Sequence, residues 1–318
     1  MPESLRKGNR RTSAWMRAAG ARGALCVCLA LLALGAGAEA ARGSEEFAVI
    51  DGRDVTVFHE PSLESMARRL VEAYPRILEN VEKALGWRLG PRPVVALAGR
   101  EETFREMGGG PFFAAFAIPS QSFVAVHCSP LNSNPYLLQE IVEHELCHLV
   151  LHDHIRDVPF PLWLEEGICQ WVSGNLGEVL VAWQPPGGSG LPRRTIPLRR
   201  LSSSFPSSEE ELFLAYDVSR EFVEDFIDRY GREGLRRVLA AMKEGRAAED
   251  AFEDETGRGI EELEAQWLRG MNRFRRWALW LAASLYEILF FLGGVLLAVA
   301  FVAKTLRKRR YAEEEEED

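Results

Sequence analysis

One short motif constrains the fold of this chain more than any other feature: two histidines separated by three residues, with a glutamate directly after the first. The motif, His144-Glu145-Leu146-Cys147-His148, lies in a stretch that the sequence predicts to be helical over residues 136–153. At 3.6 residues per turn, His144 and His148 lie about 40° apart around the helix and one turn along it. Two imidazoles so placed can bind one zinc ion, and Glu145 can reach a water on that ion. The alternative interpretation is a core helix with two incidental histidines.

A catalytic zinc ion takes three protein ligands and keeps a fourth position for water, so a third ligand must come from another element. His152 continues the same helical face, but eight residues of helix rise about 12 Å, which is too far for it to share an ion with His144. A second helix is expected directly after Pro161, and it carries Glu165 and Glu166. Spacing alone leaves both glutamates as candidates for the third ligand.

These residues resemble a known family, the gluzincin branch of the HExxH metallopeptidases, and within it the peptidase MA-like domains of bacterial envelope proteins. In that family the zinc helix is followed by a WLxEG segment, which residues 163–167 match. The resemblance implies that His144, His148 and Glu166 bind one zinc ion per chain and that Glu145 is the catalytic carboxylate. The exopeptidase motif of the long aminopeptidases is not visible before the zinc helix, so endo- and exopeptidase activity both stay open.

The expected fold is α+β and zincin-like, with a mixed N-terminal half and a helical C-terminal half. The zinc domain is expected over residues 41–276. It divides into an α/β part at 41–174, a loop at 175–206 and a helical part at 207–276. The pattern predicts a hairpin around Asp51-Gly52, a helix over 62–85 that Pro75 kinks or breaks, and strands at 94–97 and 122–127.

Later segments are expected to be helical. Leu164, Ile168 and Trp171 form the expected core stripe of the helix after Pro161. Ser208 and Glu211 suggest a capping box for a helix that Gly231 ends. Further helices are expected at residues 235–243, 247–255 and 260–276.

Several other residues are candidates for supporting roles. Tyr216 and His127 are the two candidate donors to the oxyanion of the reaction. The strand at 122–127 is expected to present an exposed edge that pairs with a substrate peptide. Cys147 is interpreted as a small buried residue or as a thiol touching the metal, and one disulfide among Cys128, Cys147 and Cys169 is possible in an oxidising compartment.

Both ends of the chain carry apolar runs beside basic clusters. Residues 1–40 are expected to be a signal peptide, cleaved after Ala40 or kept as an anchor. Residues 277–303 are long and apolar enough for one transmembrane helix, and residues 304–318 form a charged tail expected in the cytoplasm. These segments predict a single-pass protein of the cell membrane whose zinc domain is extracytoplasmic.

Composition sets limits on the function. A chain that is 47% hydrophobic and 27% charged is ordinary for a globular protein, and its net charge of −9 disfavours nucleic acid as a partner. The sequence therefore predicts a membrane-anchored, zinc-dependent peptidase that acts on a peptide or protein substrate. Two alternatives stay open: a zinc hydrolase with a non-peptide substrate, and a metal-binding interaction module without catalysis. The sequence does not reveal the oligomeric state.

Overall fold

The structure is a computed structural model of the 318-residue chain. It describes residues 47–110, 113–129, 131, 136–174, 195–271, 290, 291, 295 and 296. The chain divides into two compact units, Met1–Glu264 and Ala265–Asp318, and residues 265–271 of the second are helical. The expected signal peptide lies outside the described residues, as do the charged tail and nearly all of the expected membrane helix. Within the residues that are described, no helix combines the length and apolar character needed to span a membrane.

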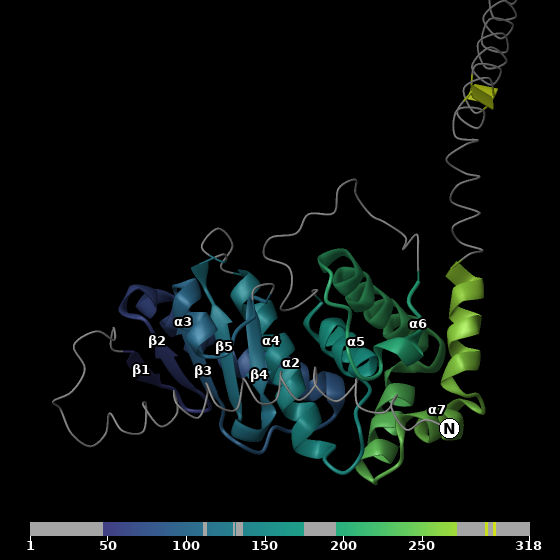
Figure 1. The fold of residues 1–318 in the computed structure, drawn as a ribbon, viewed down its shortest axis with the longest axis horizontal. Helices are drawn as coiled ribbons and strands as arrows, with labels where there is room; N and C mark the ends of the chain where they lie inside the picture. Colours follow the sequence, from purple (N-terminus) through teal and green to yellow (C-terminus); the bar gives the residue numbers. More distant parts are fainter. Residues whose placement is uncertain are drawn as a thin grey trace, which may run out of the picture. The chain divides into compact units, whose positions relative to one another are not determined.

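A five-stranded mixed sheet occupies the N-terminal part of the first unit (Figure 1). In spatial order its strands are β1 (Ala48–Asp51), β2 (Thr56–His59), β3 (Val94–Ala98), β5 (Phe123–His127) and β4 (Ala115–Ile118). β1 and β2 form the expected antiparallel hairpin, β2, β3 and β5 run parallel, and β4 is antiparallel to β5. Because β4 pairs with the outer side of β5, the prediction that residues 122–127 form an exposed edge is wrong.

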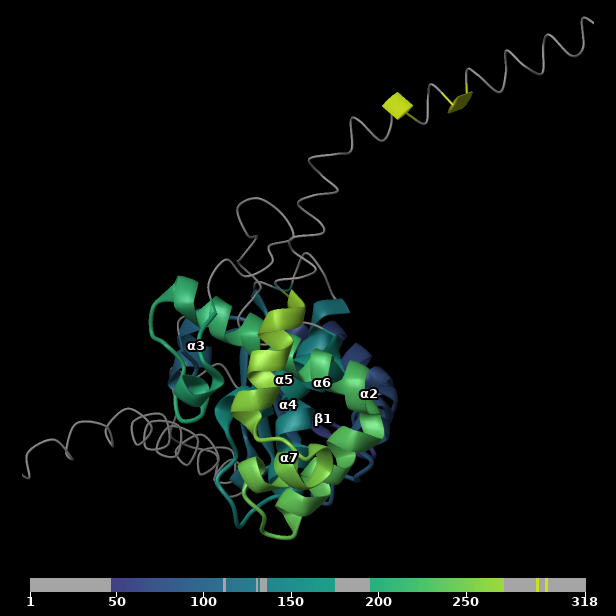
Figure 2. The same cartoon turned by 90° about the vertical axis from the view of Figure 1, so that its right-hand side faces the viewer.

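Helices cover both faces of the sheet, with α2 (Glu64–Leu85) and α3 (Glu101–Glu106) on opposite sides (Figure 2). Successive residues of a strand point to opposite faces. On one face, Phe123 and Ala125 of β5 pack with Phe104 of α3. The alternate residues of β3 and β5 point to the opposite face, on which α2 packs. They are fully buried and include Val95, Leu97, Val124 and Val126. Short 3-10 turns precede α2 and β5, at Pro61–Leu63 and Pro119–Gln121.

α2 is one 22-residue helix that continues through Pro75, so a break at this proline is not observed. Its buried residues recur every three or four positions, as expected for a helix with one apolar face. Pro75 is exposed, and the backbone hydrogen bond it removes is lost on the side that faces water. The helix ends at Gly86, whose φ of 78° suits a glycine and whose N–H donates to the carbonyl of Glu82.

The helices that carry the motif residues are α4 (Tyr136–His154) and α5 (Leu162–Ser173), close to the expected bounds. α4 packs against α2 and against the sheet at β4 and β5, and α5 packs between α4 and α6 (Glu209–Lys243). Leu164 and Ile168 are fully buried as expected. Trp171 is only half-buried, and the core tryptophan of α5 is Trp163, whose ring packs edge-on against Phe222.

The remaining helices follow α5. A 3-10 helix, η5 (Leu198–Leu201), lies within the expected loop. Gly231, at φ 75° and ψ 168°, interrupts α6 where the sequence predicts a helix end, and α7 (Ala248–Thr256) follows. Ser208 is the N-cap of α6, but its hydroxyl contacts the carboxylate of Glu211 at 3.4 Å, so the backbone bond of a capping box is not formed.

Candidate metal centre

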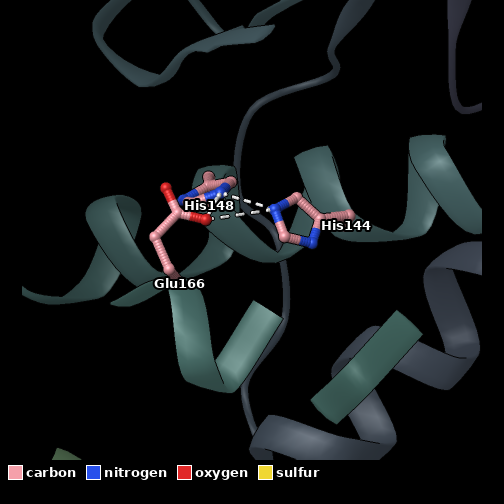
Figure 3. Close-up of side chains that lie close together, drawn as sticks. All are labelled: His144, His148 and Glu166. Atoms are coloured by element: carbon pink, nitrogen blue, oxygen red, sulfur yellow. Dashed lines mark hydrogen bonds and ion pairs between the residues drawn. The ribbon is translucent and has the colours of Figure 1, made fainter. Parts of the chain in front are cut away.

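Three side chains from α4 and α5 converge in the first unit (Figure 3). The Nε2 atoms of His144 and His148 are 3.2 Å apart. Oε2 of Glu166 lies 3.4 Å from Nε2 of His144 and 3.8 Å from Nε2 of His148. The three possible ligand atoms all lie within 4.8 Å of one another, so the cluster could hold a metal ion.

The helices explain why these atoms meet. One turn of α4 separates His144 from His148 and places both rings on the side that faces α5. Glu166 reaches them from the second turn of α5, and all three residues are at most 7% exposed. The site is therefore a buried junction between two helices.

The donor set fits a divalent cation. Oε2 of Glu166 is buried and accepts no hydrogen bond, although it faces two imidazole nitrogens. A buried carboxylate oxygen without a donor is costly, and a cation among these atoms would remove that cost. Two imidazole nitrogens and one carboxylate oxygen are the protein ligands of several catalytic zinc sites.

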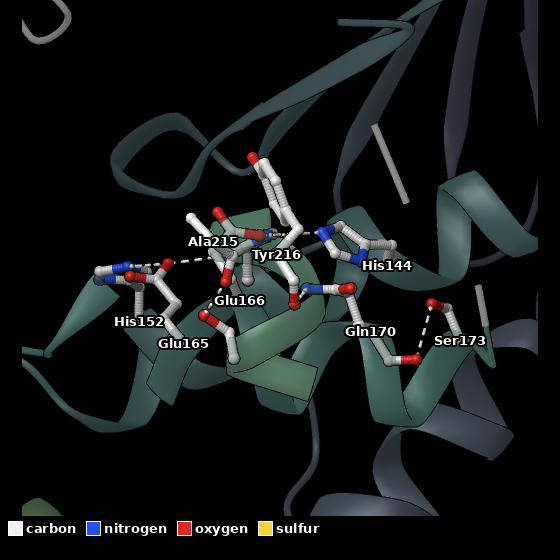
Figure 4. Close-up of polar contacts among 10 residues, drawn as sticks. His144, His152, Glu165, Glu166, Gln170, Ser173, Ala215 and Tyr216 are labelled. Carbon is white, nitrogen blue, oxygen red and sulfur yellow. Dashed lines mark hydrogen bonds and ion pairs between the residues drawn. The ribbon is translucent and has the colours of Figure 1, made fainter. Parts of the chain in front are cut away.

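Glu165 contacts a different nitrogen of His148 than Glu166 does, and Figure 4 shows its carboxylate directed toward His152. Its Oε1 accepts hydrogen bonds from Nδ1 of His148 at 2.7 Å and from Nε2 of His152 at 2.8 Å. Glu166 therefore faces the two Nε2 atoms, and Glu165 faces the opposite ring nitrogen of His148. The two glutamates, which spacing alone left as equal candidates for the third ligand, therefore contact different atoms.

The buried charged groups of the site shift one another's pKa values strongly. Burial alone would lower the pKa of His148, but the charge of Glu166 and the hydrogen bond to Glu165 raise this pKa well above its usual range. Burial alone would raise the pKa of Glu165, but the hydrogen bonds from His148 and His152 hold it well below its usual range. Glu165 therefore stays ionised, and the negative charge around His148 favours a cation.

Glu145 is fully buried on α4, directly after His144. Its charge is one of those that raise the pKa of His148, which places it within electrostatic reach of the cluster. A carboxylate beside the candidate ligands, and not among them, is suited to accept and return a proton.

The two candidate oxyanion donors have different surroundings. Tyr216 lies on α6 where this helix contacts α5, and its carbonyl accepts a hydrogen bond from Gln170 at 3.2 Å (Figure 4). Its ring packs edge-on against Phe205. His127 stacks on Phe104 at 5.5 Å between ring centroids, on the face of the sheet that α3 covers. The structure brings Tyr216 next to the ligand-bearing helix, whereas His127 packs away from it.

The three cysteines of the described region are buried free thiols. Cys147 is fully buried, and its thiol is hydrogen-bonded to that of Cys169 on α5. Burial, and then this contact, raise the pKa of Cys169 well above its usual range. The two thiols fill space between α4 and α5. The sequence did not predict this pairing or the contact of Glu165 with His152.

Comparison with known proteins gives one family match. The model of the Peptidase MA superfamily matches residues 109–272, just over half of the chain, and the match contains both ligand-bearing helices. A solved structure, that of Legionella pneumophila aminopeptidase A in complex with aspartic acid, is similar at 14% identity and a TM-score of 0.46. That similarity covers 70% of this chain and 27% of the aminopeptidase chain. No curated protein is matched at a significant level. On the family match, the chain belongs to the Peptidase MA superfamily of metallopeptidases.

Proposed function

We propose that this chain is a zinc-dependent peptidase in which His144, His148 and Glu166 bind the metal and Glu145 moves the proton. The observation that carries the proposal is the convergence of two Nε2 atoms and one carboxylate oxygen within 4.8 Å in a buried junction. Membership of a metallopeptidase superfamily supports the reaction class. The choice of zinc rests on the donor set, which combines imidazole nitrogen with a single carboxylate.

The chemistry divides between the metal and the chain. Zinc, when bound, supplies Lewis-acid activation of a water molecule and of the scissile carbonyl. Glu145 accepts the proton of the attacking water and delivers it to the nitrogen of the leaving amine. The hydroxyl of Tyr216 is the proposed donor to the oxyanion that develops on the substrate. Burial of Glu145 makes its interaction with that proton stronger than it would be in water.

The substrate is proposed to be a peptide in an extended conformation. β4 is the last strand of the sheet on the side where α4 packs, and its outer edge is available for main-chain pairing within the described part of the chain. Such pairing would hold a peptide by its backbone without demanding particular side chains. β4 thus takes the place that the sequence predicted for residues 122–127.

We also propose that the chain is anchored in the cell membrane with the zinc domain extracytoplasmic. The support is the sequence alone: the apolar segment 277–303 and the signal-like segment 1–40. Digestion of the zinc domain by a protease added to intact cells would support this topology, and full protection of the domain until lysis would contradict it.

Replacement of the proposed proton carrier tests the reaction. In the full-length chain, Glu145→Gln should keep one zinc ion and lower kcat for peptide hydrolysis by about 100-fold or more, because the amide cannot accept the proton. The matched control is Glu143→Gln, a half-buried glutamate of the same helix, which should keep wild-type activity. Zinc content and hydrolysis of a peptide library are measured together.

The outcomes separate the alternatives. Undiminished hydrolysis by the Glu145→Gln variant would contradict the assigned mechanism. A wild-type chain that holds zinc but cleaves no peptide in the library would favour a non-peptide substrate or an interaction module.

A further inference from the structure

A buried carboxylate outside the ligand cluster joins two histidines of α4. The side chain of Glu165 is 12% exposed, and its Oε1 is the acceptor for both His148 and His152. The two rings stand one turn apart on α4, whereas Glu165 comes from α5. One oxygen atom therefore links two successive turns of the zinc helix to the helix that carries Glu166.

The contact with His148 determines which nitrogen of that ring faces the ligand cluster. An ionised carboxylate is only an acceptor, so Nδ1 of His148 carries the hydrogen at 2.7 Å from Glu165. When the ring is neutral, as a metal ligand must be, Nε2 carries the lone pair, and it is the atom that lies 3.2 Å from Nε2 of His144. Without Glu165, the ring could rotate about its Cβ–Cγ bond and adopt the other tautomer.

His152 holds the carboxylate from its second side. Its Nε2 donates to the same Oε1 at 2.8 Å, and its ring lies 6.2 Å from that of Phe160, just before α5. The side chain of His152 is 36% exposed, so it closes the outer end of this hydrogen-bonded chain. A residue too far along the helix to bind the metal thus reaches the site through Glu165.

We propose that Glu165 is a positioning residue that orients His148 for metal binding, and that His152 holds Glu165 in place. The inference rests on the proposed metal site and adds a layer of residues around it. Residues that orient metal ligands in this way commonly contribute about 10- to 100-fold to metal affinity. The role predicts graded effects, because an amide at position 165 keeps an acceptor oxygen and an alanine does not.

Metal affinity is the direct test, measured on the full-length chain with a competing chelator. Glu165→Ala should weaken zinc binding by about 10- to 100-fold while still reaching one ion per chain at saturating zinc. Glu165→Gln should recover most of this loss. His152→Phe should weaken binding in the same direction and by less than Glu165→Ala. Glu143→Ala serves as a control on the same helix and should leave the affinity unchanged.

A spectroscopic readout distinguishes positioning from general loss of stability. Cobalt(II) in place of zinc should give a changed visible spectrum in Glu165→Ala and a spectrum close to wild type in Glu165→Gln. If Glu165→Ala does not fold, Glu165→Gln and His152→Phe still test the inference through affinity.

Wild-type affinity and spectrum in Glu165→Ala would overturn the role of Glu165, and unchanged affinity in His152→Phe would overturn that of His152. A different result would refute the metal site itself: one ion bound by Glu166→Ala at wild-type affinity, and none by Glu165→Ala even at saturating zinc.

Discussion

Adjacent residues of a helix point about 100° apart, so Glu165 and Glu166 reach different atoms of the same histidine. The sequence could predict both as candidates because each lies at the start of a helix that follows the zinc helix. It could not choose from spacing, because the choice depends on how α5 crosses α4. The family resemblance favoured Glu166, and the structure places that residue beside both Nε2 atoms.

His152 reaches the candidate site although it cannot share a metal ion with His144. The rise of the helix rightly separates it from His144, but the same four-residue spacing that joins His144 to His148 also joins His148 to His152. That repeat was the available signal for a shared partner of the last two histidines. The partner itself, Glu165, depends on tertiary contact, which local pattern does not reveal.

Glu221 of α6 makes stability depend on pH. Burial, and then the charge of Asp217, raise its pKa from 4.5 to about 7. The native state therefore binds this proton more tightly than the unfolded state, so the stabilising contribution is complete below about pH 4.5 and is lost as pH rises to 7. Glu221→Gln should remove that slope, with a change on the order of 1 kcal/mol after allowance for solvent screening.

Denaturant unfolding at pH 5 and pH 8 measures this effect. Between pH 5 and pH 8, the free energy of unfolding should fall by more in the wild type than in the Glu221→Gln variant. Glu79→Gln, on the exposed face of α2, is the control and should behave as the wild type. Equal pH dependence in wild type and Glu221→Gln would show that this carboxyl does not titrate as expected.

At the scale of elements, the crossing of α5 and α6 depends on a residue without a side chain. A Cβ atom at Gly167 would lie 2.4 Å from the carbonyl oxygen of Ser219 and 2.7 Å from Cγ2 of Val223. The first of these atoms is backbone and cannot move without displacing α6. Since Gly167 directly follows Glu166, this close approach also sets the position of the carboxylate at the candidate metal centre.

Gly167→Ala should therefore destabilise the chain by about 1–3 kcal/mol and weaken zinc binding, because relief of the clash moves α5 away from α6. Gly174→Ala at the end of the same helix is the control: its φ is 70°, but no atom lies within 4 Å of the added Cβ. It should cost about 1 kcal/mol of strain and leave zinc affinity unchanged. Equal zinc affinity in Gly167→Ala and wild type would contradict the link between the helix crossing and the site.

Elements with a repeated pattern were predictable, and elements defined by their partners were not. The sequence predicts α2 and α4 closely because both helices are long. It also predicts the end of α2 at Gly86 and the interruption of α6 at Gly231, because glycine commonly stands at such positions. β4 has four residues and α3 has six, too few for a periodic signal. Missing β4 led directly to the wrong placement of residues 122–127 at the sheet edge, because strand order depends on pairing between distant segments.

At the scale of the whole molecule, the predicted division into a mixed N-terminal part and a helical C-terminal part is confirmed. All five strands of the described sheet lie between Ala48 and His127, and every described element after β5 is helical. The order of elements along the chain made this division predictable. Two of these helices, α4 and α5, bring residues from separate segments together at one buried junction.

The position of the metal tests the central claim most directly. Anomalous diffraction at the zinc absorption edge, from crystals of the zinc-loaded chain, should show one strong peak bounded by Nε2 of His144, Nε2 of His148 and a carboxylate oxygen of Glu166. Glu145 should lie beside this peak without coordinating it. A peak coordinated by Glu165 in place of Glu166, or no peak at this junction after saturation with zinc, would contradict the account.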